Sequence, residues 1–212
     1  MLEINNLKYS YKQRDILKGV TFEIRLNQFI GIFGATSSGK SSIFETILNL
    51  RSFSNGTIIY ENRKVLYSNK KHIHNLKKNI GYLSQNDFFL SDETVLDNLI
   101  WISKIKKERI IEVSSLIGIT DILYSKIYDI SETEKIRFKL TLALVKSPTI
   151  LFIDEPLVSL NIAETDTFLE LVYSISKNDN FGVIVASQDI QSFKTDKFDK
   201  IFQLENGVLN EI

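Results

Sequence analysis

A run of eight residues with two glycines, a lysine and a serine is the part of this sequence best suited to chemistry. It consists of Gly34, Ala35, Thr36, Ser37, Ser38, Gly39, Lys40 and Ser41, and it fits the pattern G-x-x-x-x-G-K-[ST]. Glycines let such a backbone wrap a chain of phosphates, the lysine adds positive charge, and the serine hydroxyl is a ligand for Mg²⁺. Residues 29–33 before the run are apolar, and Ser42 opens a segment with apolar residues at helical spacing. This strand–loop–helix order predicts that the chain binds a nucleoside triphosphate, with free N–H groups of the helix facing the phosphates.

A second candidate feature is the acidic pair Asp154 and Glu155, which begins 114 positions beyond Lys40. The pair follows residues 149–153, which read as a buried strand. A carboxylate at the tip of such a strand holds Mg²⁺ through its water shell, the role expected of Asp154. Glu155 is then the group that orients or deprotonates the attacking water. Taken alone, an acidic pair after a strand is also typical of a helix or turn start.

With the residues between them, these motifs resemble the nucleotide-binding domain of the ATP-binding cassette (ABC) family, over residues 2 to about 209. The resemblance implies an α/β fold: a P-loop NTPase core with a mostly parallel sheet, an N-terminal antiparallel β subdomain and an inserted α-helical subdomain. It implies that ATP and Mg²⁺ are bound, with Ser41, Gln85 and Asp154 around the metal. Tyr11 takes the place of the aromatic that stacks on adenine, with Tyr9 as the alternative.

Three segments depart from the family pattern. Where the signature L-S-G-G-Q is expected, residues 130–134 read I-S-E-T-E, so Ser131 is kept and both glycines are lost. In the family this segment closes over the γ-phosphate of the opposite subunit, and here glutamates add bulk and negative charge. Gln188 replaces the histidine of the switch motif, and Asn161 replaces the aspartate of the D-loop. Ser131 with Glu134 also forms a capping box, which predicts a helix start.

Composition agrees with a single cassette. The chain has 212 residues, no cysteine, and 26 basic against 26 acidic residues. Balanced charge gives no global support for nucleic-acid binding, and we expect no nucleic-acid partner. No apolar run approaches the roughly 20 residues of a membrane span, and no signal peptide is expected. Lysines 70, 71, 77 and 78 form a local basic patch, interpreted as a solvated surface, with contact to lipid headgroups or a partner as the alternative.

The expected organisation is one domain, residues 1–212, with a helical subdomain at about 90–135. Residues 1–30 are predicted to form antiparallel strands, and Gly118 is predicted to end a helix. Residues 201–209 are predicted to form a hairpin turning at Asn206 and Gly207. From residue 137 onward, alternating helices and strands predict a mostly parallel sheet.

Two functions follow from the sequence. The first is an ATPase subunit that couples ATP to an integral membrane permease, with Glu155 and Gln188 at the catalytic centre. The second is a nucleotide-gated regulatory or scaffolding subunit with little turnover. The resemblance implies assembly as a homodimer or as a heterodimer with another ABC ATPase. It also implies a cytoplasmic location, peripheral to the membrane through the permease.

Overall fold

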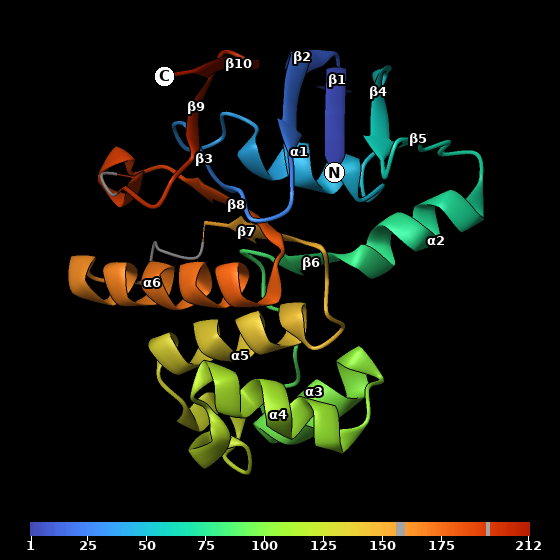
Figure 1. Ribbon diagram of the computed structural model, residues 1–212. Helices are drawn as coiled ribbons and strands as arrows, with labels where there is room; N and C mark the ends of the chain where they lie inside the picture. Colours follow the sequence, from blue (N-terminus) through green and yellow to red (C-terminus); the bar gives the residue numbers. More distant parts are fainter. Residues whose placement is uncertain (156–159, 194–195) are drawn as a thin grey trace.

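The computed structural model of the chain describes residues 1–155, 160–193 and 196–212. It contains an antiparallel sheet in the order β2-β1-β4-β5 and a second sheet in the order β10-β9-β3-β8-β7-β6 (Figure 1). The first sheet is built from β1 (Leu2–Tyr11), β2 (Arg14–Ile24), β4 (Asn55–Tyr60) and β5 (Arg63–Lys64). The second is built from β3 (Phe29–Phe33), β6 (Ile80–Leu83), β7 (Ile150–Asp154), β8 (Gly182–Ser187), β9 (Lys200–Glu205) and β10 (Val208–Glu211). The second sheet is parallel except for β10, so the predicted α/β class is confirmed.

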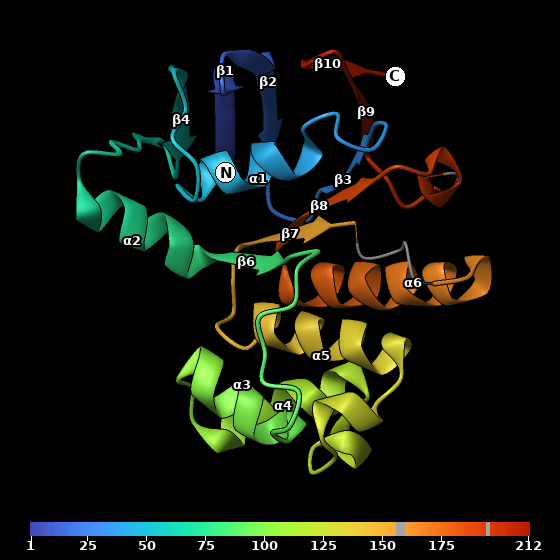
Figure 2. The ribbon, with the colours of Figure 1, turned by 180° about the vertical axis from the view of Figure 1, so that it is seen from behind.

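Helices cover both faces of the parallel sheet. On one side, α1 (Lys40–Ile47) lies between the two sheets; on the other lie α5 (Glu132–Leu144) and α6 (Ile162–Asp179) (Figures 1 and 2). Beyond α5 are α3 (Val95–Ser103), α4 (Lys107–Ile117) and the 3₁₀ turns Thr120–Ile122 and Ile127–Asp129. The remaining helical segments are α2 (Lys70–Asn79), at the side of the molecule, and the 3₁₀ turn Ile190–Phe193.

Burial of the parallel strands on both faces explains their continuous apolar sequences. Along β7, Ile150 and Phe152 point into one core with α1, whereas Leu151 and Ile153 point into the other with the helices beyond the sheet. Phe152 stacks on Phe44 of α1, with ring centroids 4.7 Å apart. This packing fixes α1, and therefore the loop before it, relative to the ends of the strands.

Several local predictions are confirmed. Helix α4 ends at Ile117, where Gly118 takes φ 76° and closes the helix. The hairpin β9–β10 turns at Asn206 and Gly207, both at positive φ. The antiparallel N-terminal part ends at Ile24 instead of residue 30, because residues 29–33 pair with β8 and β9 inside the parallel sheet. Pairing with β8 and β9 satisfies the backbone of this run, and its apolar side chains on both faces are buried only where both faces of the sheet are covered.

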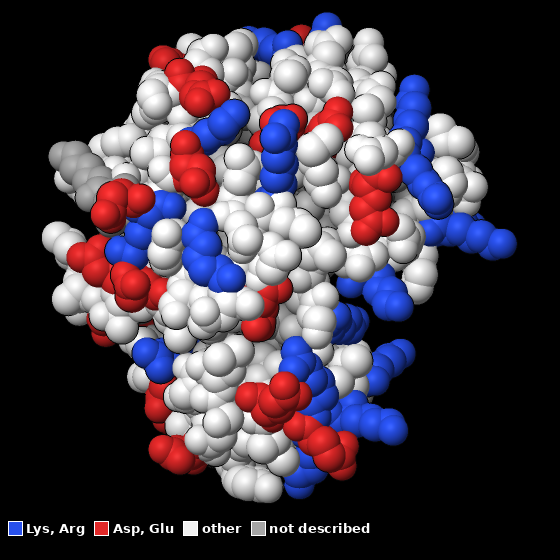
Figure 3. Space-filling view, viewed as in Figure 1, with Lys and Arg blue, Asp and Glu red and all other residues white. Residues whose placement is uncertain are grey.

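The surface carries one basic flank and one exposed indole. The α2 lysines 70, 71, 77 and 78 are all exposed, and blue side chains gather along the flank of β5 and α2 (Figure 3). Exposure in the single chain fits the predicted solvated surface and fits contact with lipid headgroups or a partner equally well. Trp101, the single tryptophan, lies on α3 and is 63% exposed. Within the described ranges, no helix has the length and apolarity to cross a bilayer.

Candidate functional site

The carboxyl ends of four neighbouring strands bring the predicted site residues together. In the order β3-β8-β7-β6, these strands run parallel and end at one edge of the sheet. The glycine loop follows β3, Gln188 follows β8, Glu155 follows β7, and Gln85 lies two residues beyond β6. Ligands of open parallel sheets bind at this edge.

The loop between β3 and α1 depends on both of its glycines. Gly39 caps α1 at φ 109°, and a Cβ atom there would meet Ile16 Cγ2 at 3.0 Å. A Cβ atom on Gly34 would lie 2.7 Å from the carbonyl oxygen of Leu204. Either substitution therefore forces the loop away from its path, as expected for a backbone that encloses phosphates.

Lys40 is buried at the base of this loop and all of its donors have acceptors. Its Nζ donates to the carbonyl oxygens of Gly34 at 2.7 Å and Ala35 at 2.9 Å. It also pairs with Glu155 Oε1 at 2.9 Å, and the two side chains are 3% and 10% exposed. The ammonium is thus held where phosphate oxygens are expected to bind, with its charge neutralised by the carboxylate of Glu155.

Glu155 is strained and only half satisfied. Its φ of 50° is in the left-handed region, which is costly for a residue with a side chain. One carboxylate oxygen pairs with Lys40, while Oε2 is buried and has no hydrogen-bond partner within the described structure. A buried acceptor left open at a strained residue is a feature of functional sites.

Asp154, at the end of β7, is held by two hydroxyl groups. Ser41 Oγ donates to Oδ1 and Tyr82 OH donates to Oδ2, each at 3.0 Å. Burial raises the pKa of Asp154 above its ordinary value, and these two hydrogen bonds partly oppose that effect. Burial and the nearby Asp154 carboxylate also raise the pKa of Tyr82, so its hydroxyl stays protonated and donates.

A cleft of about 650 Å³ opens over the loop and collects most of the predicted residues. Its lining includes Tyr11, Thr36, Ser37, Gly39, Lys40, Ser41, Ser42, Gln85, Glu155 and Gln188. Thr36 Oγ1 donates to Gln188 Oε1 at 2.5 Å, which joins the loop to the end of β8. Gly34, Ala35 and Ser38 line a second hollow, on the side of the loop that faces the β9–β10 hairpin. Asp154 does not line the cleft and is bonded to Ser41 beneath it.

Sequence reasoning missed Arg51, which also lines the cleft. Its guanidinium pairs with Glu45, donates to Tyr9 OH at 3.2 Å, and lies 5.9 Å from the Tyr9 ring centroid. These hydrogen bonds, first that to Tyr9, raise the pKa of Arg51. The sequence gives no signal for this arginine. One partner, Tyr9, lies 42 positions earlier on β1, and the other, Glu45, lies on α1 beyond the glycine-loop motif.

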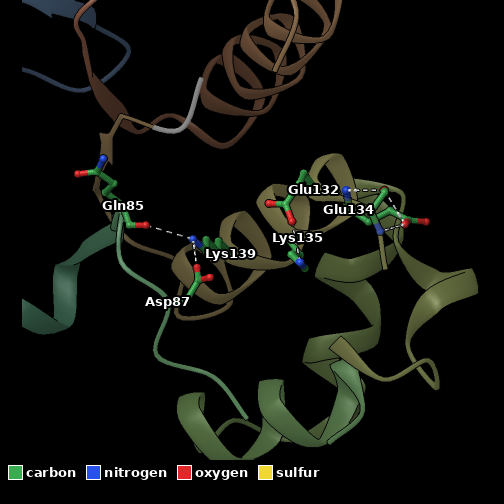
Figure 4. A network of polar contacts seen from close by, with 7 residues as sticks. Gln85, Asp87, Glu132, Glu134, Lys135 and Lys139 are labelled. Atoms are coloured by element: carbon green, nitrogen blue, oxygen red, sulfur yellow. Dashed lines mark hydrogen bonds and ion pairs between the residues drawn. The ribbon is translucent and has the colours of Figure 1, made fainter. Parts of the chain in front are cut away.

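Ser131 lies outside the cleft, at the start of α5, and its hydroxyl is used within the helix. Ser131 Oγ donates to Glu134 Oε2 at 2.7 Å, and Glu134 Oε2 also accepts from the Ser131 backbone N–H (Figure 4). The predicted capping box is therefore confirmed. These bonds lower the pKa of Glu134. Glu132 pairs with Lys135 at 2.6 Å, so both carboxylates have partners inside the chain.

Comparison with known proteins places these features in a family. The protein-family model for the family described as "ABC transporter" matches residues 17–158 of the chain. The methionine import ATP-binding protein MetN of Clostridioides difficile (strain 630) is 27% identical over 219 residues, with 100% of this chain and 68% of MetN covered.

Two solved structures share the fold. One is cbiO1 from Clostridium perfringens, part of the ABC transporter complex cbiONQ, with a TM-score of 0.88, 23% identity, and 99% and 86% of the two chains covered. The other is a dimeric ATP-binding cassette in a post-hydrolysis state bound to ADP and Pi, with a TM-score of 0.86, 22% identity, and 100% and 98% covered.

Proposed function

The chain belongs to the ABC transporter family of ATP-binding proteins, and we propose that it hydrolyses ATP to drive a separate integral membrane permease. In this proposal residues 1–212 form one cassette, with a helical subdomain at about 90–135. The observation that carries it is the single edge of the parallel sheet where the glycine loop, Glu155, Gln188 and Gln85 meet. No other part of the described structure combines a phosphate-binding loop with carboxylates.

The loop and α1 hold the nucleotide. Backbone N–H groups of residues 34–39 and the N-terminus of α1 surround the phosphates, and Tyr11, which also lines the cleft, stacks on the base. Lys40 supplies charge to the outer phosphates, and to do so it exchanges Glu155 for phosphate oxygens. Binding of ATP and release of the Lys40–Glu155 pair are therefore one event.

The residues beside the loop fit Mg²⁺. Ser41 and Gln85 line the cleft, Asp154 Oδ1 lies beneath it at 3.0 Å from Ser41 Oγ, and all three side chains carry hard oxygen donors of the kind that Mg²⁺ prefers. The raised pKa of Asp154 indicates a carboxylate that gains from a nearby cation. When bound there, Mg²⁺ would neutralise charge on the β- and γ-phosphates.

Hydrolysis then depends on Glu155 and Gln188. Once separated from Lys40, Glu155 accepts a proton from the attacking water or orients it. Gln188 donates a hydrogen bond toward the γ-phosphate, but an amide cannot carry the proton or positive charge of a histidine. We therefore expect slow turnover in the isolated chain.

The proposed partners are a permease and a second cassette. MetN is named for methionine import, and we propose that this chain likewise serves a transporter, attached to the cytoplasmic face of the membrane through its permease. The second cassette is either a copy of this chain or another ABC ATPase, since Ser131 lies away from the cleft of its own chain.

Titration calorimetry with Lys40→Ala tests the nucleotide site. The substitution removes a charge-assisted contact, so ATP affinity should fall by about one to three orders of magnitude. Lys146→Ala, which removes an exposed lysine elsewhere, is the matched control and should leave affinity unchanged. Equal affinity in the wild type and Lys40→Ala would refute the assignment.

One observation favours the regulatory alternative. Ser131 and both glutamates of the signature segment have partners within α5. The Ser131 hydroxyl must therefore release Glu134 before it can contact a phosphate bound to another chain. A chain that binds ATP and assembles but hydrolyses it hardly at all, even with its permease, would be of this second kind.

A further inference from the structure

Two neighbouring residues of α5, Phe138 and Lys139, contact residues 85–89, the segment that begins at Gln85. Lys139 pairs with Asp87, and its Nζ lies 3.5 Å from the carbonyl oxygen of Gln85, the outer limit of a hydrogen bond (Figure 4). The same ammonium lies 5.9 Å from the Phe89 ring centroid. Phe89 in turn packs edge-on against Phe138, with centroids 5.4 Å apart.

The other end of this segment is fastened to α3. Asn98 Oδ1 accepts from the Leu90 N–H at 2.8 Å, and Asn98 Nδ2 donates to the Leu90 carbonyl oxygen at 2.9 Å. Residues 85–90 are therefore held mainly by the helices beyond the sheet, whereas β6 belongs to the sheet itself. Gln85 sits between these two parts, in the nucleotide cleft.

We propose that Lys139 is a positioning residue that ties α5, the helix beginning at Ser131, to Gln85 in the nucleotide cleft of the same chain. The lysine is well placed for this, since its side chain is 12% exposed whereas that of Asp87 is 59% exposed. A shift of α5 that brings Ser131 toward a partner's nucleotide thus moves the Gln85 backbone, and Mg-ATP at Gln85 in turn favours one position of α5. The proposal rests on the proposed function for the roles of Gln85 and Ser131.

The test compares Lys139→Met with Lys107→Met in the whole chain. Lys107, on α4, is exposed, and its ammonium lies 5.7 Å from the Tyr124 ring centroid, so it is a control for the loss of a lysine charge beside an aromatic ring away from the cleft and the signature segment. ATP affinity is measured by calorimetry, kcat and KM by a radiometric assay, and amide hydrogen exchange of residues 84–90 and 131–139 with and without Mg-ATP.

In the wild type, Mg-ATP should slow exchange in both segments. Lys139→Met should lower kcat about tenfold with KM within about twofold, and should abolish the slowing in residues 131–139 while ATP still binds. Lys139→Arg should restore most of both effects, and Lys107→Met should resemble the wild type. Asp87→Asn should match Lys139→Met, and the double variant should fall no further.

The inference is overturned if Lys139→Met behaves like Lys107→Met, or if Lys139→Arg fails to restore function. It is also overturned, without harm to the proposed function, if wild-type protein binds ATP but exchange in residues 131–139 does not change. Wild-type protein that fails to bind ATP overturns both.

Discussion

At the scale of single residues, Lys40 and Glu155 form a buried ion pair, which in the proposed function links nucleotide binding to catalysis. Under that proposal, each ATP that enters competes with a carboxylate already bound to the lysine. Glu155→Gln keeps the shape but removes both the competing charge and the base. We expect ATP affinity to rise by up to about tenfold, as loss of one ionic competitor allows, while turnover falls steeply. Calorimetry and a single-turnover assay measure both; wild-type turnover in this variant would show that Glu155 is not the catalytic carboxylate.

The raised pKa of Asp154 predicts how the stability of the protein depends on pH. Its pKa in the folded chain is raised by burial above the ordinary value near 3.9. The folded state therefore binds more protons than the unfolded state between the two values, and the metal-free protein loses stability as pH rises through that window. Asp154→Asn removes the ionised form and should be more stable than the wild type at neutral pH.

Urea unfolding of the two proteins at several pH values tests this. The difference in unfolding free energy between Asp154→Asn and the wild type should shrink as pH falls, and Mg²⁺ should stabilise only the wild type. A difference that grows on acidification would contradict the assignment.

Residues of the site differ in how far the sequence could reveal them. Lys40, Ser41 and the acidic pair sit in motifs whose spacing reflects a local structure, so their meeting at one sheet edge could be predicted. Tyr82 and Arg51 could not, because their roles come from contacts across the fold with Asp154 and Tyr9. The Lys40–Glu155 pair was also beyond reach, since it depends on a strained backbone at Glu155.

At the scale of elements, the start of α5 has two roles that compete: capping the helix and, in the proposed function, contacting phosphate. The capping box of Ser131 and Glu134 stabilises the helix start by an amount on the order of 1 kcal/mol. The same bonds occupy the hydroxyl that the family uses on phosphate. The helix start could be predicted from this pattern in the sequence. The ion pair between Glu132 and Lys135 could not, because a side chain on an exposed turn has several possible partners.

Restoring the family residues should therefore exchange stability for activity. Glu132→Gly, Thr133→Gly and Glu134→Gln, combined with Gln188→His, should raise ATP turnover, because catalysis here is mostly positioning and charge stabilisation at the γ-phosphate. Two glycines in place of Glu132 and Thr133 should cost roughly a few tenths of a kcal/mol each in helix propensity, seen as a slightly lower melting temperature. A phosphate-release assay measures the gain; an unmodified chain that already reaches roughly 1–100 s⁻¹ would show that these substitutions are neutral.

At the scale of the whole molecule, Ser131 and the cleft lie apart in one chain, so the proposed function needs two chains to complete one ATP site. We expect Glu155→Gln with Mg-ATP to form a dimer detectable by light scattering, because ATP then stays bound between the two chains. Lys40→Ala under the same conditions should remain monomeric. If the first variant stays monomeric at saturating ATP, the chain pairs with a different cassette and not with itself.

The exposed indole of Trp101 gives the protein an optical reporter. As the single tryptophan, on the helices beyond the sheet, it dominates emission excited at long ultraviolet wavelengths and reports on α3 alone. In the isolated chain its spectrum should be that of a solvated ring and should be readily quenched by iodide or acrylamide. Any permease that covers α3 will shift that emission to the blue and shield it, so docking can be followed in real time without attaching a dye.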